Sequence, residues 1–253
     1  IQDQVELALM RDEHHKVARA YVLYREQRAA SRYHTKKLKE QVGVKVSSMM
    51  VTKRDGTKEA VSLDKITNRV SVLSTGLSID PIVVAQKAIP GLYNDITSTE
   101  IDNYLAETAA ALTVEHPDYS YLAARIKSNA LHKETPGFII ATKNLYDDGL
   151  LKESYYKKVI ENVDAIESII DYDRDYSFDY FALTTLIRAY LLKFENNTIE
   201  RPQDLWMRVA LTVSCEIFNL NKLKETYDTI STGLYTHATP TLFNSGLKMQ
   251  QLS

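Results

Sequence analysis

Apolar residues recur at intervals of three and four along most of this chain, and that spacing favours helices over strands. After Asp118, for example, Leu122, Ile126 and Ala130 would lie on one helical face. Glycine and proline, the residues that most often interrupt helices, number only 8 and 6 among 253 residues. The sequence therefore predicts a mainly α-helical protein.

Residues that typically begin helices stand at several places in the first half of the chain. Thr97 and Glu100 have the spacing of a capping box, Asp80 followed by Pro81 is a common helix start, and Asp64 can cap another helix. Four helices are predicted to begin at Asp64, Asp80, Thr97 and Asp118. Further helices are predicted over residues 143–150, 153–162, 178–192, 203–211 and 220–234. Residues 236–246 (THATPTLFNSG) are predicted to form a loop that leads into a strand or turn.

Residues 50–61 depart from the helical pattern. Two short runs flank Asp55 and Gly56, and an Asp-Gly pair favours the positive φ angles of a tight hairpin turn. We therefore expect a β-hairpin that lies over the four helices.

Four cationic side chains gather around this predicted hairpin: Lys53, Arg54, Lys58 and Lys65. The net charge of the chain is only -2, so any attraction for anions has to be local. Successive strand residues point to opposite faces, so Lys53 and Arg54 reach one ligand only at the strand's end or where the turn twists. Backbone N–H groups at the helix start near Lys65 also favour anions. Two interpretations remain open: a solvated cationic turn, or a site for a polyanion such as a triphosphate.

Several common functional signatures are missing from the sequence. It holds neither a Walker loop nor a G-x-G-x-x-G segment, and its histidines lack the spacing of metal ligands. The single cysteine, Cys215, excludes an internal disulfide and a multi-cysteine zinc site, and its apolar neighbours favour a buried structural role. There is no run of about 18 apolar residues and no signal peptide. We therefore expect a cytoplasmic protein that binds neither nucleic acid nor membrane.

Several longer stretches resemble one protein family. Three of them, in order, resemble an ATP-cone, the regulatory nucleotide-binding module of class I ribonucleotide reductase large subunits: VTKRDGTKEAVSLDKI, GLYNDITSTEIDNYLAETAA and HPDYSYLAARIKSNALHKET. Three more are similar to the helical amino-terminal region of the same subunit: DYDRDYSFDYFALTTLIRAYLL, ERPQDLWMRVAL and YTHATPTLFNSGLKMQQLS. The resemblance covers residues 49–253. A further stretch, RDEHHKVARAYVLYREQRAASR, is similar to the closing helix of another ATP-cone.

This resemblance implies four parts. Residues 1–33 would be the C-terminal helix of an upstream ATP-cone, and residues 34–48 a linker. Residues 49–140 would form an ATP-cone, a β-hairpin over a four-helix bundle. Residues 141–253 would form the N-terminal helical domain of the large subunit. The chain would then be a piece of a longer protein, cut before the catalytic barrel.

The family implies an allosteric site for ATP as activator or dATP as inhibitor, each with magnesium. Lys53 and Arg54 would hold phosphates, joined by Lys65 and by Lys133 from the fourth helix. Glu59 would accept a hydrogen bond from the adenine amino group. The residues that follow it would line the base and ribose: Ala60, Val61, Ser62, Leu63 and Asp64.

Other residues near the implied site leave alternatives open. Ser98 would reach ribose or phosphate, or would only cap its helix. Asp102 matches an aspartate tied to dATP inhibition, and its alternative is a solvated surface acid. His132 is expected to cap or pack rather than bind, and Arg125 to be a structural ion-pair partner. Pro90 departs from the family's usual residue and would shift the second helix.

The resemblance also implies what the full-length protein does. It would reduce ribonucleoside diphosphates at the 2′ carbon through a cysteine thiyl radical that a small radical-generating subunit supplies. Thr239 and Ser253 would contact the substrate, Thr239 through its diphosphate. No catalytic residue is expected within the chain, because the redox cysteine would follow Ser253 and Cys215 does not match it. This piece alone would therefore be inactive.

The expected partners are other large subunits, as homodimers and as nucleotide-dependent higher oligomers. One alternative is an ATP-cone that has lost its ligand and serves as a helical oligomerisation module. A second is the cone of a nucleotide-sensing repressor, which would need a four-cysteine zinc ribbon that one cysteine cannot provide.

Overall fold

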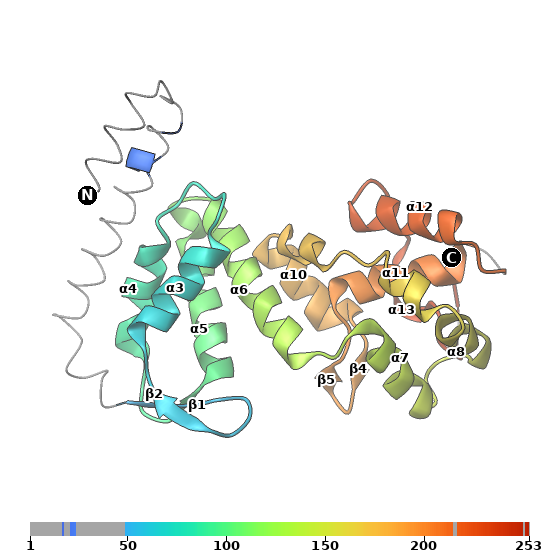
Figure 1. The fold of residues 1–253 in the computed structure, drawn as a ribbon, viewed down its shortest axis with the longest axis horizontal. Helices are drawn as coiled ribbons and strands as arrows, with labels where there is room; N and C mark the ends of the chain where they lie inside the picture. Colours follow the sequence, from blue (N-terminus) through green and yellow to red (C-terminus); the bar gives the residue numbers. More distant parts are fainter. Residues whose placement is uncertain (1–16, 18–20, 24–48, 215–216, 250, 253) are drawn as a thin grey trace. The chain divides into compact units, whose positions relative to one another are not determined.

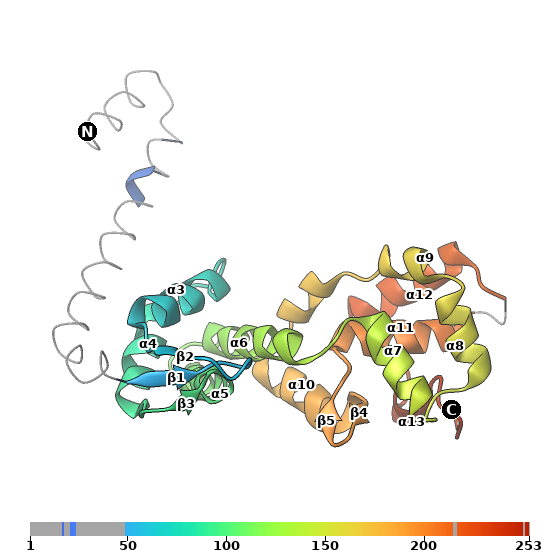
Figure 2. The same ribbon diagram turned by 60° about the horizontal axis from the view of Figure 1, so that its bottom comes forward.

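The computed structural model describes residues 17, 21–23, 49–214, 217–249 and 251–252. The described residues divide into two compact units between Ile101 and Asp102, within helix α5 (Figures 1 and 2). The helix predicted within residues 1–33 and the linker predicted at 34–48 lie outside the described residues, except that Val17 and residues 21–23 are helical. Cys215 and Ser253 also lie outside them.

The predicted hairpin is confirmed in the first unit. Strands β1 (Met50–Thr52) and β2 (Lys58–Ala60) pair antiparallel. Gly56 has a φ of 81°, as the Asp-Gly turn requires. The turn closes where the Lys53 N–H donates to the Thr57 carbonyl at 2.8 Å.

A third strand extends this hairpin into a three-stranded sheet. Strand β3 (Ile96–Thr97) pairs parallel with β1, which gives the order β2-β1-β3 (Figure 2). The prediction of two strands alone was therefore incomplete. Asp95, just before β3, has a φ of 65° and donates its N–H to the Met50 carbonyl at 2.8 Å. A strand of two residues has no hydrophobic alternation of its own, so no sequence pattern predicted β3.

Helices α3 (Leu63–Leu73) and α4 (Pro81–Ala88) pack against each other in the first unit. Asp80 caps α4 by accepting from the Ile82 N–H, as predicted. The cap of α3 is Ser62 and not Asp64, because the Ser62 side chain accepts from the Lys65 N–H. Asp64 lies in the first turn, where a negative charge still favours the helix. A 3-10 helix, η1 (Ile89–Gly91), follows α4, because Pro90 has no N–H to continue the α-helix.

Helix α5 (Ser98–Ala111) begins at the predicted capping box. The Thr97 N–H donates to the Glu100 carboxylate at 2.8 Å, and the Glu100 N–H donates back to the Thr97 hydroxyl at 3.1 Å. Leu105 and Ala109, four residues apart on one face of α5, are both buried.

The second unit is helical apart from one short hairpin. Its longest described helix is α6 (Asp118–Glu134), which begins at its predicted first residue. The other helices are η2 (Leu112–Val114), α7 (Phe138–Asp147), α8 (Glu153–Ile160), α9 (Val163–Glu167), η3 (Tyr172–Tyr176), α10 (Tyr180–Thr185), the π-helix η4 (Leu186–Tyr190), α11 (Pro202–Val213), α12 (Leu220–Ser231) and α13 (Thr239–Asn244). The hairpin consists of β4 (Lys193–Phe194) and β5 (Asn197–Thr198).

Two local predictions in this unit were wrong. Residues 239–244 form helix α13 where a loop was predicted, although the turn given as one alternative follows at residues 245–246. A proline in the first turn suits a helix because no N–H is needed there. Helix α7 begins at Phe138, five residues before its predicted start, since Gly137 precedes it and its first turn is apolar.

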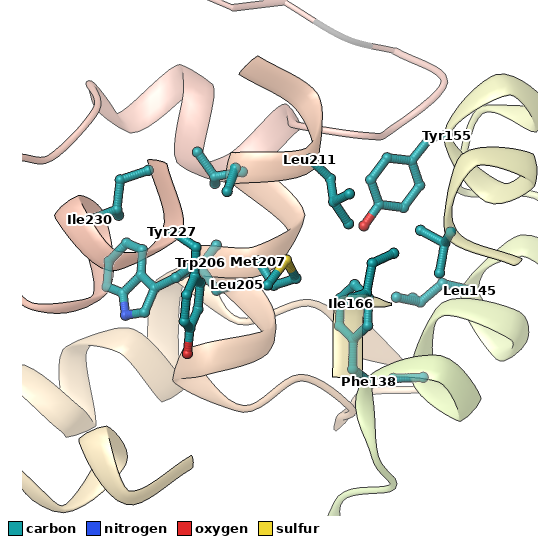
Figure 3. Packing of buried hydrophobic residues seen from close by; sticks show 14 of the residues in the cluster. Phe138, Leu145, Tyr155, Ile166, Leu205, Trp206, Met207, Leu211, Tyr227 and Ile230 are labelled. Carbon is teal, nitrogen blue, oxygen red and sulfur yellow. The ribbon is translucent and has the colours of Figure 1, made fainter. Parts of the chain in front are cut away.

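The core of the second unit surrounds α11. Residues 202–211 are all buried, which is typical of a central helix. Leu205, Met207 and Leu211 belong to one apolar cluster with Tyr227 and Ile230 of α12 (Figure 3). Helices α7, α8 and α9 add Phe138, Leu145, Tyr155 and Ile166. Among the helices that the structure describes, none combines the length and the apolar character needed to cross a membrane.

Candidate functional site

Two lysines from different elements meet at one carboxylate in the first unit. Lys53 follows β1, Glu59 lies in β2, and Lys65 lies in the first turn of α3. The Lys53 Nζ lies 2.8 Å from Glu59 Oε2. The Lys65 Nζ donates to both Glu59 oxygens, at 2.9 and 3.0 Å. We call Lys53, Arg54, Glu59 and Lys65 the basic corner.

The register of the sheet explains this meeting. Val51 pairs with Glu59, so the Glu59 side chain leaves β2 beside the end of β1, where Lys53 follows. The N-terminus of α3 follows β2 after two residues and brings Lys65 back to the same carboxylate. Lys53 and Lys65 therefore converge on one point although they are twelve positions apart.

Charge pairing shifts the pKa values in the basic corner. The hydrogen bonds from Lys53 and Lys65 hold the pKa of Glu59 below its ordinary value. The hydrogen bond to Glu59 raises the pKa of Lys53. The side chains of Lys53, Glu59 and Lys65 are 40%, 31% and 68% exposed, so the pairs are accessible to solvent and contribute little to stability. An incoming anion can therefore replace the Glu59 carboxylate as the partner of both ammonium groups.

The residues between Glu59 and Lys65 differ in what they can offer a ligand. Val61 and Leu63 point into the core, and the Val61 N–H donates to the Met49 carbonyl at 2.9 Å. That these two residues line a base or ribose stays a prediction. Ala60 and Asp64 are exposed, and the partly buried Ser62 is already engaged as the cap of α3.

Ser98 does not cap α5. Thr97 makes the capping interactions, while the Ser98 hydroxyl donates to the Thr52 carbonyl of β1 at 3.4 Å. Ser98 therefore lies beside Thr52, the last residue of β1, which Lys53 follows in the sequence. Its proposed contact with ribose or phosphate stays a prediction.

Asp102 is buried, with 1% of its surface exposed, so the alternative of a solvated surface acid was wrong. It shares a helical face with Leu105, Ala106 and Ala109, which are also buried. That spacing was visible in the sequence and could have predicted the burial. A buried carboxylate requires polar partners, which gives Asp102 a defined orientation.

Arg54 and Lys133 are both exposed. Arg54 is one residue past Lys53, in the turn of the hairpin. Lys133 lies in the last turn of α6, in the second unit. That Lys133 contacts a ligand of the basic corner stays a prediction.

His132 packs against other side chains, as expected, whereas the ion pair predicted for Arg125 stays a prediction. The His132 ring lies 2.6 Å from the Asp175 carboxylate and packs edge-on against Tyr172 and Tyr176. The Arg125 Nε donates to the Tyr176 carbonyl at 3.2 Å. Asp175 lies in the acidic segment 171–181, which forms η3 and the start of α10.

Thr239, the predicted substrate contact, is the exposed first residue of α13. Its hydroxyl lies 3.4 Å from the Tyr190 hydroxyl, and the Tyr190 ring stacks on Phe243. The second predicted substrate contact, Ser253, lies outside the described residues.

Sequence reasoning missed a third ion pair, next to the two of the basic corner. Lys58 of β2 pairs with Asp95, the residue with positive φ before β3. The Asn94 side chain accepts from the Met50 N–H at 2.9 Å and so fixes the same loop to β1. An Asn-Asp pair favours left-handed turns, and that was the available signal. Within the described residues, no group of three or more His, Cys, Asp or Glu side chains could hold a metal ion.

Two family models match the chain. Residues 49–134 match the ATP cone domain, and residues 176–250 match the all-alpha domain of ribonucleotide reductase. The first match contains the basic corner, and the second contains α11, α12 and α13. The fold is thus an ATP cone followed by the all-alpha domain of a ribonucleotide reductase.

Relatives of known name agree with these matches. The chain is 42% identical over 225 residues to a ribonucleoside-diphosphate reductase large subunit of Dictyostelium discoideum. The aligned region covers 83% of this chain and 26% of that relative. It is 43% identical over 220 residues to the large subunit of Caenorhabditis elegans, and that aligned region covers 82% of this chain and 28% of the relative. It is 42% identical over 218 residues to the ribonucleoside-diphosphate reductase large chain of Schizosaccharomyces pombe, and that aligned region covers 81% of this chain and 27% of the relative. The chain belongs to the family of ribonucleotide reductase large subunits and spans about a quarter of the length of these relatives.

Proposed function

We propose that the basic corner binds the phosphates of an adenine nucleotide and that the chain is the allosteric part of a ribonucleoside-diphosphate reductase large subunit. The observation that carries this proposal is the convergence of Lys53 and Lys65 on the single carboxylate of Glu59. Two ammonium groups within 3.0 Å of one anionic group are spaced to hold another anion in its place. The match to the ATP cone domain supports a nucleotide as that anion.

Binding would proceed by exchange of partners. The triphosphate takes Lys53 and Lys65 from Glu59, and Arg54 and Lys133 add further charge. The released Glu59 carboxylate then accepts from the adenine amino group. ATP would activate and dATP would inhibit, and Ser98 and Asp102 are the proposed sensors of the difference of one hydroxyl.

Magnesium would come to the site on the nucleotide. The nearest carboxylate in the turn, Asp55, already accepts from the Thr57 N–H at 2.9 Å and from its hydroxyl at 2.6 Å. These bonds lower the pKa of Asp55 and fix its orientation within the turn. Mg²⁺ commonly keeps its waters and binds through substrate phosphates, so this setting fits a nucleotide-borne ion.

For the whole protein we propose reduction of ribonucleoside diphosphates in the cytoplasm. Thr239 and Ser253 would contact the substrate, and the catalytic thiols would lie outside this chain. The proposed partners are a second large subunit, higher nucleotide-dependent assemblies and a small radical-generating subunit. The supporting observation is the 42–43% identity to large subunits over four-fifths of the chain.

Calorimetric titration of ATP and dATP, each with Mg²⁺, tests the binding proposal. We expect saturable binding of both nucleotides. The double variant Arg54→Ala/Lys65→Ala should bind at least about tenfold more weakly, because each lost charge-assisted hydrogen bond is worth about 1.5–3 kcal/mol. The matched control Arg188→Ala/Lys157→Ala removes the same two kinds of cation from the exposed surface of the second unit.

Each outcome of this titration is informative. Unchanged affinity in the Arg54→Ala/Lys65→Ala variant would refute the residue assignment. Equal losses of nucleotide affinity in the variant and the control would mean that the effect comes from net charge and not from these two residues. If the unaltered chain binds neither nucleotide, the alternative of a helical oligomerisation module without a ligand replaces the proposal.

A further inference from the structure

An arginine from the all-alpha part of the chain caps the last helix of the cone. The final carbonyls of a helix have no intrahelical partners. At the end of α6, the Arg201 Nη2 donates to the His132 carbonyl at 3.2 Å and to the Thr135 carbonyl at 2.9 Å. The Arg201 Nε donates to the Thr135 hydroxyl at 2.9 Å. A cation at this end also complements the helix dipole.

Arg201 is itself held in place. Its guanidinium lies 4.8 Å from the centroid of the Tyr172 ring. The backbone N–H of Arg201 donates to the Asp204 carboxylate at 2.9 Å, and the Tyr172 hydroxyl donates to the same carboxylate at 2.7 Å. Asp204 is fully buried in the first turn of α11. The Arg201 backbone is therefore fixed to α11, and its guanidinium cannot turn away from α6 without losing its contact with the Tyr172 ring of η3.

A second connection starts from the same turn of α6. His132 lies 2.6 Å from Asp175 of η3, and Asp175 accepts from the Gln203 amide at 3.0 Å. The Gln203 oxygen accepts from the Tyr227 hydroxyl at 2.7 Å. Four side chains thus link α6, η3, α11 and α12 in one series, in which His132 is partly buried and Asp175, Gln203 and Tyr227 are fully buried. Within a low-dielectric interior such networks favour one arrangement, because a half-made network leaves buried polar groups without partners.

Lys133 occupies the next position after His132 and is exposed. The same helical turn therefore presents an inward side chain to the buried network and an outward cation to solvent. A ligand that contacts Lys133 therefore acts on this last turn of α6. In the same turn the His132 carbonyl accepts a hydrogen bond from Arg201, and the His132 ring is hydrogen-bonded to Asp175.

We propose that Arg201 is a positioning residue for the nucleotide site and that, together with the His132–Asp175 pair, it couples occupancy at Lys133 to the packing of α11 and α12. This inference rests on the proposed function, in that it requires the nucleotide to contact Lys133. Coupling is reciprocal, so the state of α11 also alters nucleotide affinity.

Hydrogen–deuterium exchange of the full 253-residue chain tests the coupling, with and without saturating Mg²⁺ and dATP. In the unaltered chain, dATP should slow amide exchange in α11 and α12 about fivefold or more, the lower end of typical allosteric coupling. In Arg201→Met this protection should fall below about twofold while calorimetry still detects bound dATP. The control Arg188→Met, an exposed arginine of the same unit, should behave as the unaltered chain does.

A second variant keeps the test decisive if Arg201→Met does not fold. Thr135→Val removes the hydroxyl that accepts from the Arg201 Nε and donates to the Leu131 carbonyl, keeps the Thr135 carbonyl that accepts from Nη2, and should lose part of the protection. Full protection in the folded variant would overturn the proposal. So would dATP binding to the unaltered chain without any change in α11 and α12, and in that case the binding proposal stands. Failure of the unaltered chain to bind dATP overturns both.

Discussion

A buried ion pair ties three parts of the second unit together. The side chains of Arg208 and Glu200 are 2% and 3% exposed, and the Arg208 Nη2 donates to Glu200 at 3.1 Å. Glu200 also accepts from the Leu192 N–H at 2.9 Å, and the Arg208 Nη1 donates to the Ser245 carbonyl at 2.9 Å. The pair thus joins α11 to the β4–β5 hairpin and to the end of α13, the helix that begins with Thr239.

Substitution of Glu200 by alanine should destabilise this unit strongly. It leaves the Arg208 charge buried without its counter-ion, at a cost of about 3–5 kcal/mol. For a unit of this size, roughly 2–4 °C is lost per kcal/mol, so the unfolding midpoint should fall by about 6–20 °C. The chain's single tryptophan, Trp206, is buried in α11, and its fluorescence reports the transition directly.

The double variant Glu200→Leu/Arg208→Met separates charge burial from packing. Removal of both charges should make it more stable than Glu200→Ala, because an apolar pair of similar volume often replaces a buried ion pair without loss. A loss below about 1 kcal/mol in Glu200→Ala would refute the reasoning. A double variant that is less stable than Glu200→Ala would do the same.

Three further predictions concern single groups. Glu59→Gln should strengthen binding of inorganic tripolyphosphate by at least about threefold, since the Glu59 carboxylate no longer competes with the phosphates for Lys53 and Lys65. Unchanged affinity in calorimetry would count against that competition. Burial raises the pKa of Asp204 from 3.8 to about 7, so the folded state holds a proton that the unfolded chain releases. Stability should therefore fall as the pH rises from about 4 to 7, by up to about 1.4 kcal/mol per pH unit, and urea unfolding of Asp204→Asn should lack this component. Gly246→Ala should cost about 1–3 kcal/mol more than Gly233→Ala, because an added Cβ at Gly246 would overpack against the Tyr155 ring at 3.2 Å while one at Gly233 would meet nothing. Both glycines have positive φ, so backbone strain cancels in the comparison, and equal melting points would contradict the steric argument.

The sequence predicted those elements whose signals are local. Asp80 with Pro81 and Thr97 with Glu100 begin helices through contacts within three residues, so their patterns were sufficient. Strand β3 depends on the backbone of β1, which is distant in sequence, and two residues carry no periodicity. Helix α13 was missed because its short TPTLFN segment was interpreted through its turn-forming residues.

The candidate site shows the same division. The clustering of Lys53, Arg54 and Lys65 was visible in the sequence, but their convergence on Glu59 depends on the register of β1 with β2 and on the entry of α3. The link from His132 to Asp175 spans 43 positions, and no spacing rule connects them. Such contacts follow from tertiary packing and could not be derived from pattern alone.

The central claim is that one polyphosphate takes the place of the Glu59 carboxylate at Lys53 and Lys65. A crystal structure of the chain grown with Mg²⁺ and dATP measures this directly. We expect triphosphate oxygens within about 3 Å of both Nζ atoms and the Glu59 carboxylate withdrawn from at least one of them. A triphosphate bound elsewhere, with both lysines still on Glu59, would contradict the claim.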